Sequence, residues 1–137
     1  MTHETIHPEG WAPAKGYANG MLAPDGTLHV GGHIGWDADQ RIVPGGFIGQ
    51  MRQALENVVA VVEAAGGTAS DVARLTWFVT DKRDYLAHQK AVGEAYREVF
   101  GRHFPAMSML IVAGLVEDDA VVEIEATAHV TRAAEAR

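Results

Sequence analysis

The sequence predicts an α+β domain in which two helices cover one face of a single mixed sheet. Apolar and polar residues alternate in several short segments, as in strands with one buried face, and apolar residues recur every three or four positions in two longer segments. The predicted order is strand, strand, helix, strand, helix, strand, strand. Because two helices can cover only one face of a sheet, the opposite face is left open.

The first two strands, 16–23 and 27–34, are predicted to form a hairpin around the turn Pro24-Asp25-Gly26. Successive side chains of a strand point to opposite faces, so the second strand has one apolar and one polar face. The predicted polar face carries His29, Gly31 and His33.

Both helices are bounded by residues that commonly start or stop a helix. The first is predicted to begin after Gly45 and to stop at Gly66, and its apolar residues form one stripe. The second can be capped by Asp81 or Asp84 and is predicted to end at Gly101.

The remaining strands are predicted at 72–80, 106–113 and 122–130, and Glu123 and Glu125 share one face of the last strand. The open face of the sheet is then a mixture of polar and apolar side chains. It is expected to carry His29, Gly31, His33, Arg74, Thr76, Phe78, Met107, Met109, Ile111, Glu123, Glu125, Thr127 and His129. Such a face is too apolar for bulk water and too polar for a dry core, so we expect it to be buried against other copies of the chain.

The composition indicates one domain over residues 1–137, with an N-terminal arm at 1–14 and a tail at 131–137 that is expected to fray. The formal net charge is −7 and Lys and Arg are not clustered, which argues against a nucleic-acid partner. The sequence has no cysteine, no signal-peptide pattern and no stretch long enough to cross a bilayer. We therefore expect a cytoplasmic protein without a membrane partner.

Several stretches of the sequence resemble one known family. They are KGYANG, HVGGHIGWDADQRIV, QALENVVAVVEAAGG, LTWFVTD and FPAMSMLIVAGLVEDDAVVEIEATA. Together they run from about Gly16 to Ala128 and resemble the Rid/YjgF family of reactive-intermediate deaminases. The resemblance implies a single Rid-like domain with a chorismate-mutase-like fold. It also implies a homotrimer whose sheets form a central barrel, with clefts for a small-molecule ligand between subunits.

The resemblance also implies which residues form the site. Enzymes of the family hydrolyse enamines and imines to ketones and ammonia with a Tyr, a Ser, an Arg and a Glu. The Tyr falls on Tyr17 and the Glu on Glu123. The Ser falls on Gly31, which is followed by Gly32 and by His33 in place of the usual Gln, and the Arg falls on Met107.

The replacement of the Arg changes the ligand that this chain is expected to bind. A guanidinium binds a substrate carboxylate through two parallel hydrogen bonds, which Met107 cannot do. We therefore expect an enamine or imine that is neutral or aromatic, rather than 2-aminoacrylate. The predicted substrate-binding residues are Gly31, Gly32, Trp36, Phe78, Met107 and Met109.

Glu123 is the candidate base that activates water, and Tyr17 and His33 are candidates to assist it. The simpler alternative for Glu123 is a structural carboxylate that is paired with Arg74 or hydrogen-bonded across the barrel. For Tyr17 it is a packed aromatic ring, and for His33 a histidine that is hydrogen-bonded within the sheet. The alternative for the whole chain is a non-catalytic trimer that binds or senses a small molecule. No metal or cofactor is expected, since His29 and His33 would lie about 13 Å apart along a strand, too far to share an ion.

Overall fold

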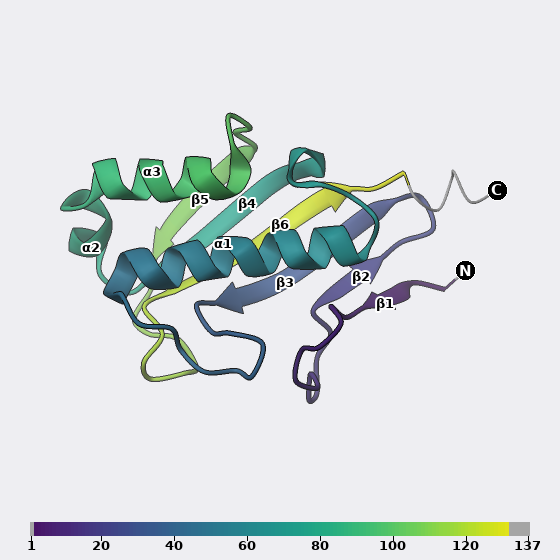
Figure 1. Cartoon of the computed structure of the whole chain (residues 1–137), viewed down its shortest axis with the longest axis horizontal. Coiled ribbons are helices and arrows are strands. Elements are labelled where there is room, and N and C mark those ends of the chain that lie inside the picture. Colours follow the sequence, from purple (N-terminus) through teal and green to yellow (C-terminus); the bar gives the residue numbers. More distant parts are fainter. Residues whose placement is uncertain (1, 132–137) are drawn as a thin grey trace.

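A computed structural model describes residues 2–131, which form one six-stranded sheet with its helices on one face (Figure 1). The strand order is β1-β2-β3-β6-β4-β5, and only the pairing of β4 with β5 is parallel. The strands are β1 (Glu4–Ile6), β2 (Gly20–Leu22), β3 (Thr27–Ile34), β4 (Val72–Val79), β5 (Ala106–Ile111) and β6 (Val122–His129). The predicted α+β class and mixed sheet are confirmed.

The helices lie side by side in front of the sheet (Figure 1). Helix α1 (Gly46–Ala64) crosses β3 and β6, and α3 (Gln89–Phe100) lies toward the edge formed by β4 and β5. A short 3-10 helix (Ala69–Asp71) precedes β4. The start of α1 uses Gly45 at φ 105°, a left-handed conformation that glycine adopts without strain.

The second predicted helix is divided in two by a non-helical residue. Helix α2 (Lys82–Leu86) is capped by Asp81, whose side chain accepts a hydrogen bond from the backbone N–H of Arg83. His88 has φ −130° and ψ 29°, and its Nδ1–H donates to the carbonyl of Asp84 at 2.8 Å. The helix is therefore interrupted at His88, and α3 begins at the next residue.

Both ends of the chain differ in part from the prediction. Residues 4–6, expected to belong to an arm, pair with β2 as strand β1, and Ile6 is buried in the core. The first predicted strand, 16–23, is shorter and covers Gly20–Leu22. Of the tail expected at 131–137, the residues 132–137 lie outside the described part of the chain.

The hydrophobic core fills the space between α1, α3 and the covered face of the sheet. Met51, Leu55 and Val58 of α1 are fully buried, as are Leu75 of β4 and Ile124 of β6. Glu123 and Glu125 alternate with the buried residues of β6 and lie on the open face, as predicted. No helix within residues 2–131 is long and apolar enough to cross a membrane.

A β-bulge at Gly31-Gly32 changes the face on which the end of β3 lies. Val30 is opposite Ala126 and His33 is opposite Ile124, so β3 uses one more residue than β6 over this interval. Because of the extra residue, side chains after the bulge point to the opposite face from the one that strict alternation along β3 would give. His33 therefore lies on the covered face and is 3% exposed, and its predicted place on the polar face with His29 is wrong.

Strand β5 also has the opposite phase to the one predicted. Met107 is opposite Leu75 and Met109 is opposite Trp77, so both methionines lie on the side of the helices. The strand is apolar on both faces apart from Ser108, so its sequence does not reveal which face is inward. The predicted place of Met107, Met109 and Ile111 on the open face is wrong.

Candidate functional site

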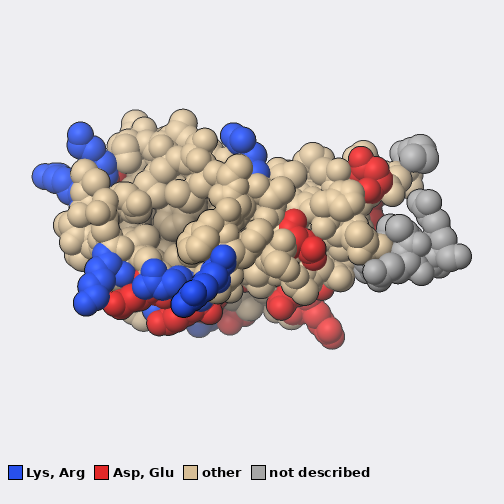
Figure 2. Space-filling view, turned by 90° about the horizontal axis from the view of Figure 1, so that it is seen from above, with Lys and Arg blue, Asp and Glu red and all other residues tan. Residues whose placement is uncertain are grey.

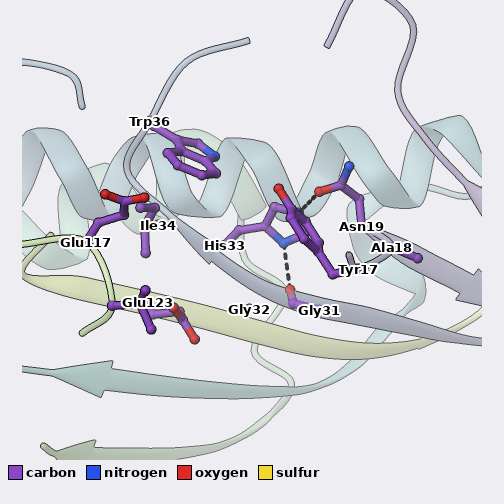
Figure 3. A pocket seen from close by; sticks show the side chains of 11 residues that line it. Tyr17, Ala18, Asn19, Gly31, Gly32, His33, Ile34, Trp36, Glu117 and Glu123 are labelled. Atoms are coloured by element: carbon purple, nitrogen blue, oxygen red, sulfur yellow. Dashed lines mark hydrogen bonds between the residues drawn. The ribbon is translucent and has the colours of Figure 1, made fainter. Parts of the chain in front are cut away.

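A cavity of about 440 Å³ opens at the bulge in β3, between the segment before β2 and the loops around Trp36 and Glu117 (Figure 3). It is large enough for a small molecule. The lining residues are Tyr17, Ala18, Asn19, Gly31, Gly32, His33, Ile34, Trp36, Val116, Glu117 and Glu123. The cavity thus unites six of the residues predicted from the sequence: Tyr17, Gly31, Gly32, His33, Trp36 and Glu123.

The carboxylate of Glu123 packs directly against the backbone of Gly32. A Cβ atom placed on Gly32 would lie 2.4 Å from Oε2 and 2.8 Å from Cδ of Glu123, so a side chain at residue 32 would displace the carboxylate. Glu123 is half-buried, and burial, followed by the charge of Glu125, raises its pKa above the ordinary value of 4.5. Both causes make this carboxylate a stronger base than an exposed one.

Tyr17 lies at the exposed rim of the cavity. Half of its surface is accessible, and its hydroxyl accepts a hydrogen bond of 3.3 Å from Nε2 of Gln40. The hydroxyl proton is not used in this bond, so it can be donated to a ligand.

His33 is held from both sides. Its Nδ1 is 2.6 Å from the carbonyl of Gly31, to which it donates, and its Nε2 is 3.1 Å from Oδ1 of Asn19 (Figure 3). Burial lowers the pKa of His33 from 6.5 to about 4, so the ring is neutral near pH 7. This geometry favours the alternative of a hydrogen-bonded sheet histidine.

The hydrogen bonds of His33 are part of a longer series of hydrogen bonds. The neutral side chains in this series can donate one hydrogen fewer than the number of bonds. The contacts run from the Trp11 carbonyl through His7, Asn19 and His33 to the Gly31 carbonyl. Each of these links needs a donated hydrogen. Two neutral imidazoles and one amide provide one donor each, which leaves one link without a proton.

Two polar residues of α1 hold the loops that form the cavity walls. Asn57 donates from Nδ2 to the carbonyls of Ile34 and Trp36, at 3.1 and 2.9 Å. Gln50 donates to the carbonyl of Asp119 and accepts from the N–H of Val121. Both side chains are buried, so these bonds also satisfy groups that water cannot reach.

Sequence reasoning missed several of these residues. Asn19, Val116 and Glu117 line the cavity, and nothing in the local sequence distinguishes them from ordinary loop residues. Gln50 and Asn57 carry a signal that could have been used. They are polar, are seven positions apart, and interrupt the apolar stripe of α1, which indicates a structural bond inside the protein.

The other predicted site residues do not line this cavity. Phe78 is opposite Glu123 in the pairing of β4 with β6 and shares its face, but lies outside the lining. Met107 and Met109 line a second cavity, of about 260 Å³, on the helix side of the sheet. Within one chain they therefore do not meet Glu123.

Ionic partners and metal ligands are sparse near Glu123. The ion pairs found within residues 2–131 are Arg52 with Glu98 and Arg83 with Asp81, so Glu123 is not paired with Arg74 there. In the same part of the chain no group of three His, Cys, Asp or Glu residues is placed to hold a metal ion.

Comparison with known proteins identifies the family. The family model described as Endoribonuclease L-PSP matches residues 9–130, nearly the whole chain. The chain belongs to the Rid/YjgF family. The RutC family protein UK114 of Drosophila melanogaster is 41% identical over 117 residues, which cover 85% of this chain and 80% of that protein.

Solved structures of the family have the same fold. The Escherichia coli YjgF gene product is 34% identical with a TM-score of 0.77, and the match covers 92% of this chain and 98% of that one. E. coli TdcF with bound serine is 31% identical with a TM-score of 0.77, over 92% and 98% of the two chains. The family resemblance noted in the sequence is thus confirmed.

Proposed function

We propose that this Rid/YjgF protein is a hydrolytic deaminase that converts an enamine or imine to a carbonyl compound and ammonia. The observation that carries the proposal is the half-buried Glu123 carboxylate, with its raised pKa, at the wall of an open cavity beside Gly32. A base of this kind can take a proton from water at neutral pH.

The proposed reaction uses Glu123 twice. An enamine first takes a proton on carbon and becomes an iminium ion. Glu123 then removes a proton from water while the water oxygen bonds to the iminium carbon, which gives a neutral carbinolamine. In the second step the protonated carboxyl returns its proton to nitrogen, the carbon–nitrogen bond breaks, and the hydroxyl loses its proton to solvent. The products are a carbonyl compound and ammonia. Tyr17, which lines the cavity, orients the substrate through its hydroxyl in this proposal.

The charges of the cavity favour a substrate without a carboxylate. Its lining includes the carboxylates of Glu117 and Glu123 and neither Lys nor Arg. Two negative groups attract an iminium cation and repel an anionic substrate. Met107 stands at the position of the family's carboxylate-binding Arg and cannot bind a carboxylate, so it also favours a substrate without one. We therefore propose a neutral or aromatic imine rather than 2-aminoacrylate.

We further propose that the protein works as a cytoplasmic homotrimer whose clefts are completed by neighbouring subunits. Strand β5 is an edge strand with exposed apolar side chains, Met107, Leu110 and Ile111 among them, and Phe104 beside it is 68% exposed. An apolar edge of this kind is normally covered by another chain. A monomeric mass in light scattering at micromolar concentration would contradict this proposal.

The experiment is ammonia release from imines produced in situ by an amine oxidase. Benzylamine and cyclohexylamine give imines without a carboxylate, and amino acids give imines that carry one. Glu123→Gln should lose most activity on the first class, whereas Glu125→Gln, on the same face of β6, is the matched control and should remain active. A Glu123→Gln variant as active as the unmodified protein on every substrate would remove Glu123 from the mechanism.

The second candidate is a non-catalytic trimer that binds a small molecule. It is favoured by the departures from the family's site at Gly31 and Met107 and by the serine bound to the related TdcF. Ligand binding without ammonia release above the spontaneous rate would support it. RNA cleavage, to which the family model's description refers, is not favoured, because the net charge is −7 and acidic side chains accompany the basic ones (Figure 2).

A further inference from the structure

One residue that does not line the cavity at Glu123 has an unusual backbone conformation. Gln40 has φ 63°, and within residues 2–131 it is the one residue other than glycine with a positive φ. This left-handed conformation brings Cβ close to backbone atoms, so glycine is the residue that usually adopts it. A strained residue persists where the surrounding structure holds it, and such residues are common at functional sites.

Hydrogen bonds within the turn hold Gln40 in this conformation. Its backbone N–H donates to the carbonyl of Asp37 at 2.9 Å. The carboxylate oxygen Oδ1 of Asp37 accepts from the backbone N–H groups of Asp39 and Arg41, at 2.9 and 3.1 Å. The path of the turn therefore requires a left-handed residue at position 40, and the chain has a glutamine there instead of glycine.

The side chain of Gln40 makes a contact that glycine cannot make. Its Nε2 donates to the hydroxyl oxygen of Tyr17 at 3.3 Å. The amide thus occupies a lone pair of the phenol oxygen and leaves the hydroxyl hydrogen free to point elsewhere. Since Tyr17 lines the cavity, a bound ligand can accept that hydrogen.

The backbone that carries Tyr17 is anchored on both sides, although it forms neither a helix nor a strand. Before it, the N–H of Ala12 donates to the carbonyl of Ala38 at 2.8 Å, which is part of the same turn as residue 40. After it, the carbonyl of Asn19 accepts from the N–H of Gly31 at 3.0 Å. The freedom that remains is that of the Tyr17 side chain, which is 50% exposed and has little packing to restrict it.

We propose that Gln40 is a positioning residue, whose side-chain amide directs the hydroxyl of Tyr17 toward a ligand in the cavity at Glu123. The strained backbone of Gln40 is retained because only a side chain at this position of the turn makes the contact. The inference rests on the proposed function, in which Tyr17 orients the imine. Gln40 acts through Tyr17 and not on the substrate, since it lies outside the cavity lining.

Gln40→Gly removes the amide and also relieves the strain, so activity and stability should respond differently. On the imine of benzylamine, kcat/KM should fall about fivefold, as for the loss of one hydrogen bond. The midpoint of urea unfolding should change little, because relief of strain offsets the greater freedom of glycine in the unfolded chain. Asp39→Ala, which removes an exposed side chain of the same turn, is the matched control and should change neither quantity.

A double-mutant cycle separates positioning of Tyr17 from a general effect on the turn. In the Tyr17→Phe background the hydroxyl is absent, so Gln40→Gly should lower kcat/KM no further. If Gln40→Gly lowers kcat/KM by the same factor in both backgrounds, Gln40 does not act through Tyr17. A large loss of stability in Gln40→Gly would show that the glutamine backbone is not strained.

NMR tests the contact in the unmodified full-length protein, without reference to activity. A nuclear Overhauser effect should join the side-chain amide of Gln40 to the ring of Tyr17, one of three tyrosines, whose signals the Tyr17→Phe variant assigns. These ring signals should move in Gln40→Gly and stay in place in Asp39→Ala. Ammonia release no faster than the spontaneous rate would reject the deaminase, and the NMR contact alone would then decide this inference. The inference is overturned if that contact is absent, or if an active protein loses no activity in Gln40→Gly.

Discussion

The carboxylate of Glu123 occupies the space that a side chain on Gly32 would fill, since a Cβ atom there would lie 2.4 Å from Oε2. Gly32 lies in the bulge of β3 and Glu123 on the neighbouring strand β6. The bulge therefore has two effects. It directs His33 into the protein, and it leaves room for the carboxylate at the wall of the cavity.

Gly32→Ala should displace the carboxylate and reduce the rate of imine hydrolysis roughly ten- to a hundredfold, because catalysis is sensitive to the position of a base. Gly32 does not have a positive φ, so alanine adds no backbone strain. Gly31→Ala is the comparison variant: it also adds a methyl group to the cavity wall, but its Cβ would be 3.4 Å from the nearest atom, an ordinary contact, and would not displace Glu123. Steady-state kinetics of both variants checks this, and equal rates for both would contradict the role of the packed carboxylate.

The pH dependence of the reaction should follow Glu123. The base must be ionised, so kcat/KM should fall as the pH drops through a pKa above 4.5. Glu125→Gln removes one cause of the raised pKa, so it should move this acidic limb to lower pH. An acidic limb that stays unchanged in Glu125→Gln would show that another group controls it.

His33 should make the protein less stable in mild acid. Burial lowers its pKa to about 4 in the folded state, whereas in the unfolded chain it stays near 6.5. The unfolded state therefore binds the proton first, and stability present above pH 6.5 is lost as the pH falls toward 4, by at most about 3 kcal/mol. In urea unfolding, the free energy of unfolding of His33→Gln should fall less between pH 6.5 and 4 than that of the unmodified protein. His29→Gln, on the exposed face of β3, should lose as much as the unmodified protein.

Asn57→Ala should loosen the loop around Trp36 and lower the free energy of unfolding by about 1–3 kcal/mol, because the buried carbonyl of Ile34 and the part-buried carbonyl of Trp36 lose their donor. Glu56→Ala, at an exposed neighbouring position of α1, is the control and should change stability little. Denaturant unfolding measures both variants. If they are equally stable, the bonds from Asn57 do not support the cavity wall.

Much of the fold could be predicted because its signals are local. The alternation in 72–79 and 122–129 and the apolar stripe of α1 depend on burial of one face, and all three elements are found where they were expected. The face of Glu123 follows from the same alternation in β6.

The errors arose where pairing between strands, rather than local sequence, decides the outcome. Two glycines allow a bulge, but only the register against β6 shows that His33 is turned inward. Met107 and Met109 lie in a strand with apolar residues on both faces, so the pairing with β4 alone fixes their side. The break between α2 and α3 is a separate, local error, since the apolar periodicity does not reveal the non-helical backbone of His88.

Single-turnover ammonia release with Glu123→Gln, on the imines of benzylamine and cyclohexylamine, tests the central claim most directly. We predict that the unmodified protein accelerates release of ammonia from these uncharged substrates more than from imines of amino acids. The acceleration by Glu123→Gln should be at least about a hundredfold smaller than that by the unmodified protein. Acceleration that is the same with and without the Glu123 carboxylate would contradict the account.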